Sequence, residues 1–451
     1  MHRAEAARNA PRHEPAAQAP LRVLLVSLFH PELVRGGAQQ ICYELFEELK
    51  QQPGVVPILL ASIDNSYPAL FKSGACITGF DGREDEFLFL MQDYDYWWHK
   101  TSSPRMIEAF AEFLHTVRPD VVHFHHFLTF GVDLLTLTRR ELPDARIVFT
   151  SHEFMSICAA DGHMVRKTDR SLCTRASDVR CHQCFPDRPP EQFFMRRQWM
   201  MRHLAAVDAF TCPSSFMLDF YTQWGLAPAR LHHITNGQRR YGEIQPSPPG
   251  PKVRFGFFGQ MVDDKGIHII LRAVRLLRAQ GFTGFVVEIN GENIRWASAP
   301  VREEVEAFLA AERELPPEEQ IVYHNGGYHI DDLGSRMARV DWSIVPSTWW
   351  EIFGLVISEA WMFGKPVICS NRGGPGERVR HDVDGLQFQL GDARALAETI
   401  QRAATEDGLW ERLRANLPEP PSRPAMAREF LDLYRGGAPL PSAVGKKDLT
   451  A

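Results

Sequence analysis

The chain has 451 residues, of which 44% are hydrophobic and 24% are charged, an ordinary composition for a globular protein. Its formal net charge of −6 argues against a nucleic-acid partner, and no stretch approaches the roughly 18–20 consecutive apolar residues of a membrane-spanning helix. Because one hydrophobic core rarely supports a chain of this length, we expect two large domains.

The first segments predict a tail, a buried strand and a helix. Residues 1–20 are rich in Ala, Arg and Pro and predict a disordered tail, and the apolar run at 23–28 predicts a strand. No small-residue cleavage site follows that run, so we expect a cytoplasmic protein. Gly36 and Gly37 precede a helix expected at 39–50, where glycines let the backbone approach a phosphate or a sugar. Turn chemistry alone is the other explanation for this pair.

Alternation of β-branched runs with helical stretches continues through the first half and predicts a doubly wound α/β domain. The further strands expected are 56–61, 121–124, 147–150 and 209–212, and the helices are 103–117 and 195–207. Histidines stand at the ends of two of these strands, His152 at one, and His123, His125 and His126 at the other. Ligands bind at that edge of such sheets, so we expect His152 to reach into an interdomain cleft. Packing is the more usual role for a lone histidine.

Four of the eight cysteines cluster between residues 158 and 184 and end in a Cys-x-x-Cys pair. In a cytosolic chain these side chains are reduced thiols, and four thiolates can complete a tetrahedral structural zinc site. The candidate ligands are Cys158, Cys173, Cys181 and Cys184. Free thiols or a redox-sensitive pair are the alternatives, because the first spacing is looser than in common zinc modules. The other four cysteines have apolar neighbours and are expected in the core: Cys42, Cys76, Cys212 and Cys369.

Prolines divide the chain into two halves. Four of them fall between residues 239 and 252, which predicts a linker at 241–252. The second half resumes the α/β alternation, with strands expected at 253–258, 285–289, 321–324, 342–345 and 366–369 and helices at 267–280, from 393 to about 417, and at 425–434. A proline-rich break precedes the last of these, so we expect residues 419–435 to cross back to the first domain and 436–451 to form a disordered tail.

Lys265 ends the loop between the first strand and the first helix of the second half, where its charge opposes the helix dipole. A bound diphosphate would account for this cation, because Lys265 could stabilise a departing anion. A surface lysine with a partly buried stem is the alternative.

Two glutamates, Glu351 and Glu359, flank the start of a helix expected to open at Gly354. The unpaired N–H groups of such an end suit a phosphate, and the two carboxylates can accept hydrogen bonds from sugar hydroxyls on either side of it. Solvated glutamates stabilised by the helix dipole are the alternative. Glu377 ends another glycine-rich loop and is expected near the sugar or near Lys265.

Five short motifs follow one another in the second half: Pro346-Ser347, Glu351-x7-Glu359, Gly364-x-Pro366-Val367, Gly373-Gly374-Pro375-Gly376-Glu377 and Asp384-Gly385-Leu386. In this order they closely resemble the signature of glycosyltransferase family 4, retaining enzymes of the GT-B class. The resemblance covers residues 21 to 435 and implies two Rossmann-like doubly wound parallel-sheet domains facing across a cleft. The acceptor domain would be 21–240, with a Cys-rich insertion at 158–184, and the nucleotide-sugar domain 253–418.

The resemblance also implies roles for individual residues. Glu351 would bind hydroxyls of the donor sugar, and Glu359 would bind the ribose diol. The diphosphate would lie beside Lys265, on the amides around Gly354, Leu355 and Val356. His152 would line the reaction centre.

Other matching positions extend the donor site that the resemblance implies. Tyr328 lies where the family often contacts the base through its main chain, and Gly36, Gly37, Gly259 and the Asn236-Gly237 pair fall at matching elements. Many members carry arginine directly after that last glycine, whereas this chain has Gln260. Charge neutralisation would then depend more on Lys265 and the helix amides, unless Arg35 or Arg372 compensates. The Cys-rich insertion is absent from the common pattern of the family.

We expect the protein to transfer a hexose from a nucleotide diphosphate-sugar to a glycan or a lipid-linked saccharide, with retention of configuration and without a metal ion. No cofactor is expected to be required, and the expected role is in cell-surface polysaccharide synthesis. A nucleotide-sugar epimerase, a glycan phosphorylase and a non-catalytic carbohydrate-binding relative are the alternatives. The aromatic run at 94–98 could stack on acceptor sugars, and the basic, apolar segment at 195–203 could make a peripheral membrane contact. Ordinary packing explains both segments as well.

Overall fold

The computed structural model describes residues 19–64, 66–67, 74–242 and 250–437. Most of the expected tails and linker, residues 1–18, 243–249 and 438–451, lies outside the described residues. In the described part of the chain, no helix is both long and apolar enough to cross a lipid bilayer.

An eight-stranded sheet organises the described residues of the first half, in the order β10-β9-β8-β7-β1-β2-β4-β3. Its strands are β1 (Leu21–Ser27), β2 (Val55–Ile63), β3 (Ile77–Gly79), β4 (Glu86–Leu90), β7 (Val121–Phe124), β8 (Arg146–Thr150), β9 (Ala209–Cys212) and β10 (Leu231–His233). Neighbouring strands pair in parallel except β3, which is antiparallel to β4. The apolar centre of β1 is fully buried, as expected for a central strand covered on both faces.

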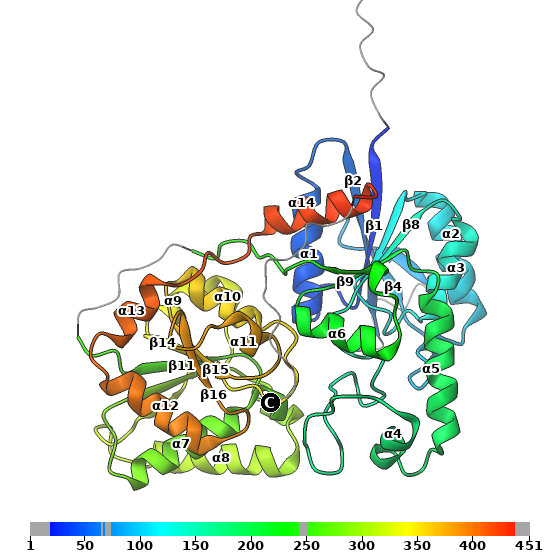
Figure 1. The fold of residues 1–451 in the computed structure, drawn as a ribbon. Helices are drawn as coiled ribbons and strands as arrows, with labels where there is room; N and C mark the ends of the chain where they lie inside the picture. Colours follow the sequence, from blue (N-terminus) through cyan, green and yellow to red (C-terminus); the bar gives the residue numbers. More distant parts are fainter. Residues whose placement is uncertain (1–18, 65, 68–73, 243–249, 438–451) are drawn as a thin grey trace, which may run out of the picture.

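Helices connect and cover this sheet (Figure 1). They are α1 (Gly37–Leu49), α2 (Pro104–Val117), α3 (Asp133–Glu141), α4 (Asp178–Cys184), α5 (Pro190–Leu204) and α6 (Ser215–Trp224), and a small hairpin is formed by β5 (Tyr94–Asp95) and β6 (Lys100–Thr101). The helix expected at 195–207 begins five residues earlier, because Pro190 is well suited to a first helical turn.

The second half contains a six-stranded parallel sheet in the order β13-β12-β11-β14-β15-β16. Its strands are β11 (Arg254–Phe258), β12 (Val286–Asn290), β13 (Val322–His324), β14 (Trp342–Val345), β15 (Val367–Ser370) and β16 (Gly385–Phe388). The five strands expected here are present with ends that differ by one residue at most. Strand β16 was not expected from the sequence.

The helices of this half are α7 (Ile267–Ala279), α8 (Ala299–Arg313), α9 (Leu333–Met337), α10 (Leu355–Met362), α11 (Gly373–Arg378), α12 (Ala393–Thr405) and α13 (Leu409–Ala415), with 3-10 turns at η3 (Asp263–Lys265), η4 (Ile294–Trp296) and η5 (Ile330–Asp332). The single helix expected from 393 to about 417 is wrong. The first helix ends at Thr405, because the backbone of Glu406 is extended, and the second starts after Gly408, whose φ of 72° lies in the left-handed region.

Helix α14 (Arg423–Tyr434) crosses from the second half to the first and packs against α1 (Figure 1). Arg423 at its start pairs with Glu44 and Glu48 of α1. At its other end, the Tyr434 hydroxyl lies 2.7 Å from Nδ1 of His123, which is in β7. The core of the first domain therefore includes a helix that follows the second domain in sequence.

Candidate functional site

Two loops meet at the switch point of the second sheet, where β11 and β14 are neighbours although β12 and β13 lie between them in sequence. Ligands of doubly wound folds bind at such points, beyond the carboxyl ends of the strands. Lys265 lies in the loop after β11, and Glu351 lies in the loop after β14. Lys265 Nζ donates to Glu351 Oε2 over 2.6 Å, so the structure brings together these two predicted catalytic residues.

Glu351 is held by further contacts. Its Oε2 also accepts hydrogen bonds of 3.1 Å from Ser347 Oγ and from Trp349 Nε1. The Lys265 ammonium lies 5.5 Å from the centre of the Trp349 ring. Only 8% of Glu351 is exposed, and such a buried carboxylate needs partners of this kind.

A glycine brings the two loops into contact. Gly266 has a φ of 74°, and a Cβ at this position would lie 2.0 Å from the carbonyl oxygen of Pro346. Any larger residue would push the Lys265 loop away from the Glu351 loop. Gly259 and Gln260 open the same loop, and the Gly259 N–H donates to the Asn290 carbonyl over 3.0 Å.

Helix α10 begins at Leu355, directly after Gly354, as expected. Arg378 fixes this start: its guanidinium donates to the carbonyls of Phe353 (3.1 Å) and Gly354 (2.9 Å) and to Ser358 Oγ (2.6 Å). Burial lowers the pKa of Arg378 to about 9, so the side chain stays charged at neutral pH. The N–H groups of the first turn of an α-helix have no hydrogen-bond partner within the helix. Because Arg378 fixes this end of α10, these groups keep a constant direction.

The glycine pair of the first domain lies at the same helix end. A Cβ on Gly37 would be 3.5 Å from Cδ1 of Leu355, and Leu355 packs against the core cluster that includes α1. Gly36 caps α1 just before it. The structure therefore brings Gly36 and Gly37 from one domain to the predicted phosphate-binding turn of the other.

Glu359 lies on the second turn of α10 and is 7% exposed. Its Oε1 accepts a 3.1 Å hydrogen bond from Gln238 Nε2. Burial raises the pKa of Glu359 to about 7, and the bond from Gln238 offsets part of that rise. Burial raises the pKa of the Tyr328 phenol, and the negative charge of Glu359 raises it further. Tyr328 also packs against the hydrophobic cluster that includes Ile357 and Ala360 of α10, and the ribose and base roles of Glu359 and Tyr328 stay predictions.

His152 follows β8 and contacts another histidine of its own domain. Its Nε2 lies 3.0 Å from Nδ1 of His125, and the two rings are stacked. Burial lowers the pKa of His152 to about 4, so the imidazole is neutral at physiological pH. Nε2 of His125 is buried without a hydrogen-bond partner. The neighbouring His126 pairs with Glu153 at 3.1 Å.

Glu377, in α11, makes a contact between the domains. Its two carboxylate oxygens accept hydrogen bonds of 2.9 Å from the backbone amides of Ser215 and Phe216, at the start of α6 in the first domain. The carboxylate caps that helix and suits its dipole. Its expected position beside a donor sugar stays a prediction.

Sequence reasoning missed four residues that support the site: Arg378, Gln238, Asp264 and Trp350. Three of them stand next to residues that it identified, since Asp264 precedes Lys265, Trp350 precedes Glu351 and Arg378 follows Glu377. Gln238 follows the Asn236-Gly237 pair, which also falls at a family element, and that position was its only signal. For Arg378 the sequence gives no sign of its partners, because these are backbone carbonyls 24 and 25 residues away.

The four clustered cysteines line one small cavity, and none of them forms a disulfide. Among the described residues, however, no three His, Cys, Asp or Glu side chains are already placed to hold a metal ion. The geometry as it stands therefore gives the predicted zinc site no direct support.

Packing accounts for much of the aromatic and basic segments. Arg196 of α5 is buried and donates to the carbonyls of Met155 (2.8 Å) and Ser156 (3.1 Å). Trp199 Nε1 donates to the Trp98 carbonyl over 2.8 Å. Tyr96, by contrast, is 62% exposed.

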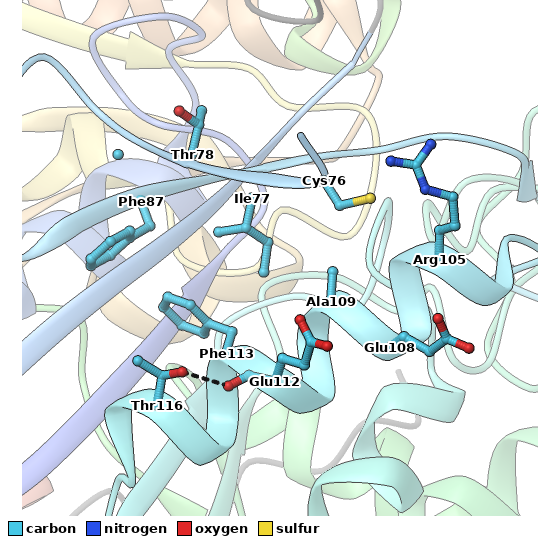
Figure 2. A pocket seen from close by; sticks show the side chains of 11 residues that line it. Cys76, Ile77, Thr78, Phe87, Arg105, Glu108, Ala109, Glu112, Phe113 and Thr116 are labelled. Carbon is cyan, nitrogen blue, oxygen red and sulfur yellow. Dashed lines mark hydrogen bonds between the residues drawn. The ribbon is translucent and has the colours of Figure 1, made fainter. Parts of the chain in front are cut away.

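A separate cavity of about 560 Å³ opens between β3 and α2 (Figure 2). Arg105, Glu108 and Glu112 line it from the helix, together with Ile77 and Phe87 from the strands. None of the residues predicted to act on a donor lines this cavity.

Two family models match adjacent parts of the chain. The model for Glycosyltransferase Family 4 matches residues 35–238, and the model for Glycosyl transferases group 1 matches residues 243–419. The chain is a family 4 glycosyltransferase. Its expected fold class, GT-B with two doubly wound parallel-sheet domains, is confirmed by the two sheets and by the solved structures that it resembles.

Individual relatives of this glycosyltransferase are distant. A putative glycosyltransferase YtcC of Bacillus subtilis is 28% identical over 161 residues, which span 36% of this chain and 38% of the Bacillus protein. Glycogen synthase of Mycobacterium tuberculosis is 23% identical over 87% of this chain and 88% of its own length.

Two solved structures share the fold of the glycosyltransferase. Sucrose-phosphate synthase (tll1590) from Thermosynechococcus elongatus superposes with a TM-score of 0.65 at 19% identity, covering 92% of this chain and 98% of that one. Alr3699/HepE from Anabaena, solved in complex with UDP and glucose, has a TM-score of 0.63 at 16% identity over 92% of this chain and 99% of its own.

Proposed function

We propose that this glycosyltransferase is a retaining hexosyltransferase that moves a sugar from a nucleotide diphosphate-sugar to a saccharide or lipid-linked saccharide, in the synthesis of a cell-surface polysaccharide. The observation that carries the proposal is the Lys265–Glu351 pair at the carboxyl ends of adjacent strands, beside the start of α10. The complexes of Alr3699/HepE with UDP and with UDP-glucose support a nucleotide-sugar as donor.

Each donor group has a candidate partner. The diphosphate would bind the amides of Gly354, Leu355 and Val356 and replace Glu351 as the partner of Lys265. Glu351, released from the ammonium, would accept hydrogen bonds from sugar hydroxyls. The ribose hydroxyls would donate to Glu359.

The reaction is a front-face attack on the anomeric carbon. The bond from that carbon to the diphosphate oxygen breaks while the bond to the acceptor oxygen forms on the same face of the sugar. The departing diphosphate oxygen takes the proton of the acceptor hydroxyl. Lys265 and the α10 amides stabilise the negative charge that develops on the leaving group, without requiring a metal ion.

The proposal is tested by incubating the protein with UDP-, GDP-, dTDP- and ADP-sugars and measuring thermal unfolding. The true donor binds the folded state and raises the unfolding temperature. Transfer to a saccharide acceptor is then followed by NMR, which reads the anomeric configuration of the product. A product with inverted configuration would refute retention.

Incubation of the same donor without acceptor addresses the epimerase alternative. A transferase hydrolyses the donor slowly at most, whereas an epimerase converts it to a second nucleotide-sugar. Conversion of this kind would replace the transferase proposal.

A lipid-linked acceptor has weaker support, from two exposed apolar side chains on α5. Phe194 is 48% exposed and Met195 is 54% exposed, and Arg197 follows them. Together they suit the surface of an anionic membrane. Flotation with anionic vesicles should carry the native protein upward and leave the Phe194→Ser, Met195→Ser double variant behind. Equal flotation of both proteins would argue against this contact.

A further inference from the structure

The Cys-rich insertion, residues 158–184, has little regular structure to hold its shape. Within the described residues it contains the seven-residue helix α4 and one isolated bridge between Val165 and Leu172. No residue of α4 is buried. A segment of this kind needs another source of order, because fixing each residue costs about 1–2 kcal/mol in backbone entropy.

Four thiols converge inside the insertion. Cys158 and Cys173 come from its loops, and Cys181 and Cys184 come from α4. All four line one cavity of about 30 Å³, together with apolar residues such as Met164, Val165 and Phe185 and with two arginines, Arg166 and Arg180. This volume is near that of a single water molecule or ion, and the surroundings are mainly apolar.

The sulfur atoms make few other contacts. Cys158 Sγ lies 3.9 Å from the Ala160 carbonyl and Cys173 Sγ lies 3.4 Å from the Arg175 carbonyl, both weak interactions for a thiol. Four soft sulfur ligands around a space for one ion match the preference of Zn²⁺ for tetrahedral thiolate sites. The cation would draw the sulfurs inward, because they line the cavity without yet forming a coordination shell.

The insertion touches the other domain beside the donor residues. Asp264, the residue before Lys265, accepts from Arg170 Nη2 at 2.7 Å and lies 2.8 Å from Nδ1 of His163. Trp350, the residue before Glu351, donates through Nε1 to the backbone carbonyl of Cys173 at 3.0 Å.

These contacts connect the thiol cluster to the donor site by short paths. The backbone of one cysteine is itself bonded to the Glu351 loop. The Trp350 ring also stacks on Phe216 of the first domain, with 5.8 Å between ring centres. Any change in the shape of the insertion would therefore reach both loops that carry Lys265 and Glu351.

We propose that Cys158, Cys173, Cys181 and Cys184 bind one zinc-type divalent cation, and that the metal-bound insertion clasps the donor domain at Asp264 and Trp350. The cation fixes the loop that presents His163 and Arg170. The metal site does not depend on the proposed function. The effect of the Asp264 and Trp350 contacts on donor binding does rest on the proposed function.

Metal content tests the site directly. The full-length protein is produced with added zinc, purified under reducing conditions without chelator, and measured by elemental mass spectrometry. We expect about one zinc per chain, and Co²⁺ in its place should give the intense sulfur-to-cobalt absorption of a four-thiolate tetrahedral site.

Matched variants make the result specific. The Cys181→Ser, Cys184→Ser double variant should lose the metal, whereas Cys76→Ser, a buried cysteine outside the insertion, should keep it. Native protein with less than about 0.1 zinc per chain and no cobalt absorption overturns the proposal. Because the native protein is measured, a variant that fails to fold does not obscure the answer.

The clasp is tested with Arg170→Ala, which should keep its zinc but bind the nucleotide-sugar several-fold more weakly. Arg175→Ala is the control, since this arginine belongs to the same insertion but lines a different cavity. Unchanged donor affinity in Arg170→Ala overturns the clasp. If the protein binds zinc but transfers no sugar, the proposed function fails while the metal site stands.

Discussion

Lys265 and Glu351 are paired directly with each other, whereas His152 in the first domain is paired with a second histidine, His125. The donor-side pair comes from loops that follow two adjacent strands, and a glycine contact fixes their approach. The first domain instead presents buried, neutral imidazoles and a long insertion. The difference indicates that Lys265 and Glu351, 86 residues apart, are held together by a contact between two loops, whereas His125 and His152, 27 residues apart, are positioned by neighbouring strands of one sheet.

Replacing Lys265 should have the largest effect. Lys265→Ala removes the cation that faces the leaving group, and we expect kcat to fall by about 10²–10³. Lys252→Ala is the matched control: this lysine precedes β11, at the opposite edge of the sheet, and stacks over Trp410. Initial rates of donor consumption with excess acceptor measure both. Equal rates in the two variants would remove Lys265 from the mechanism.

A smaller loss is expected at the first-domain histidine. His152→Ala should lower kcat by about tenfold, the value of one hydrogen bond of roughly 1.4 kcal/mol. His115→Ala, which removes a surface histidine paired with Glu141, should leave the rate unchanged. Because His152 titrates near pH 4, its protonation should not shape the rate profile between pH 6 and 8. If kcat fell as far in His152→Ala as in Lys265→Ala, the expected difference between the histidine pair and the Lys265–Glu351 pair would be wrong.

Glu359→Gln should change the dependence of stability on pH. The folded-state pKa of Glu359 is raised to about 7, so the folded protein binds its proton more tightly than the unfolded chain. Native stability therefore falls as pH rises from about 4.5 to 7 and is lowest above that range. The variant lacks this fall and should be more stable than the native protein at pH 8, by roughly 1–3 kcal/mol.

Urea unfolding at pH 5 and pH 8 measures this difference. Donor binding adds a second readout: native affinity should weaken below pH 7 as Glu359 becomes protonated, whereas the affinity of Glu359→Gln should be lower, by about fivefold at pH 8, and independent of pH over the same range. Parallel pH profiles in both proteins would show that Glu359 does not face the ribose.

The smallest effect is expected at the contact between the domains. Glu377→Gln replaces a charged acceptor by a neutral one at the α6 amides, and charge-assisted hydrogen bonds are about twice as strong as neutral ones. We expect a two- to threefold rise in donor KM, of the order of 0.5 kcal/mol, with little change in kcat. Small-angle scattering should show a more open average shape. Glu398→Gln on α12, an exposed position, serves as the control.

The sequence predicted much of the second domain, because its chemistry lies in short motifs next to strands. The loop of Lys265, the start of α10 at Gly354 and the position of Glu359 all follow from local patterns of glycines, charges and apolar runs. Parallel strands whose carboxyl ends share one edge then bring these loops together.

Other parts could not be predicted, because they depend on contacts between distant segments. The local sequence places Glu377 at the end of a glycine-rich loop, yet the two amides that donate to its carboxylate lie 161 and 162 residues earlier in the chain. His125 and His152 follow adjacent strands that were both expected, yet nothing in the sequence specified that their rings would stack. The break at Gly408 was missed for another reason, since a single glycine within a helical pattern is often tolerated.

The crossing of α14 has a consequence for biosynthesis. His123 and Tyr434, which are 311 residues apart, meet in the core of the first domain, and α1 is paired to Arg423. During translation the first domain cannot complete its packing when its own strands emerge, because residues 423–434 are still to be made. The strands of the second domain end at Phe388, so all of them are made before α14. We therefore expect the second domain to reach its native fold before the first domain does.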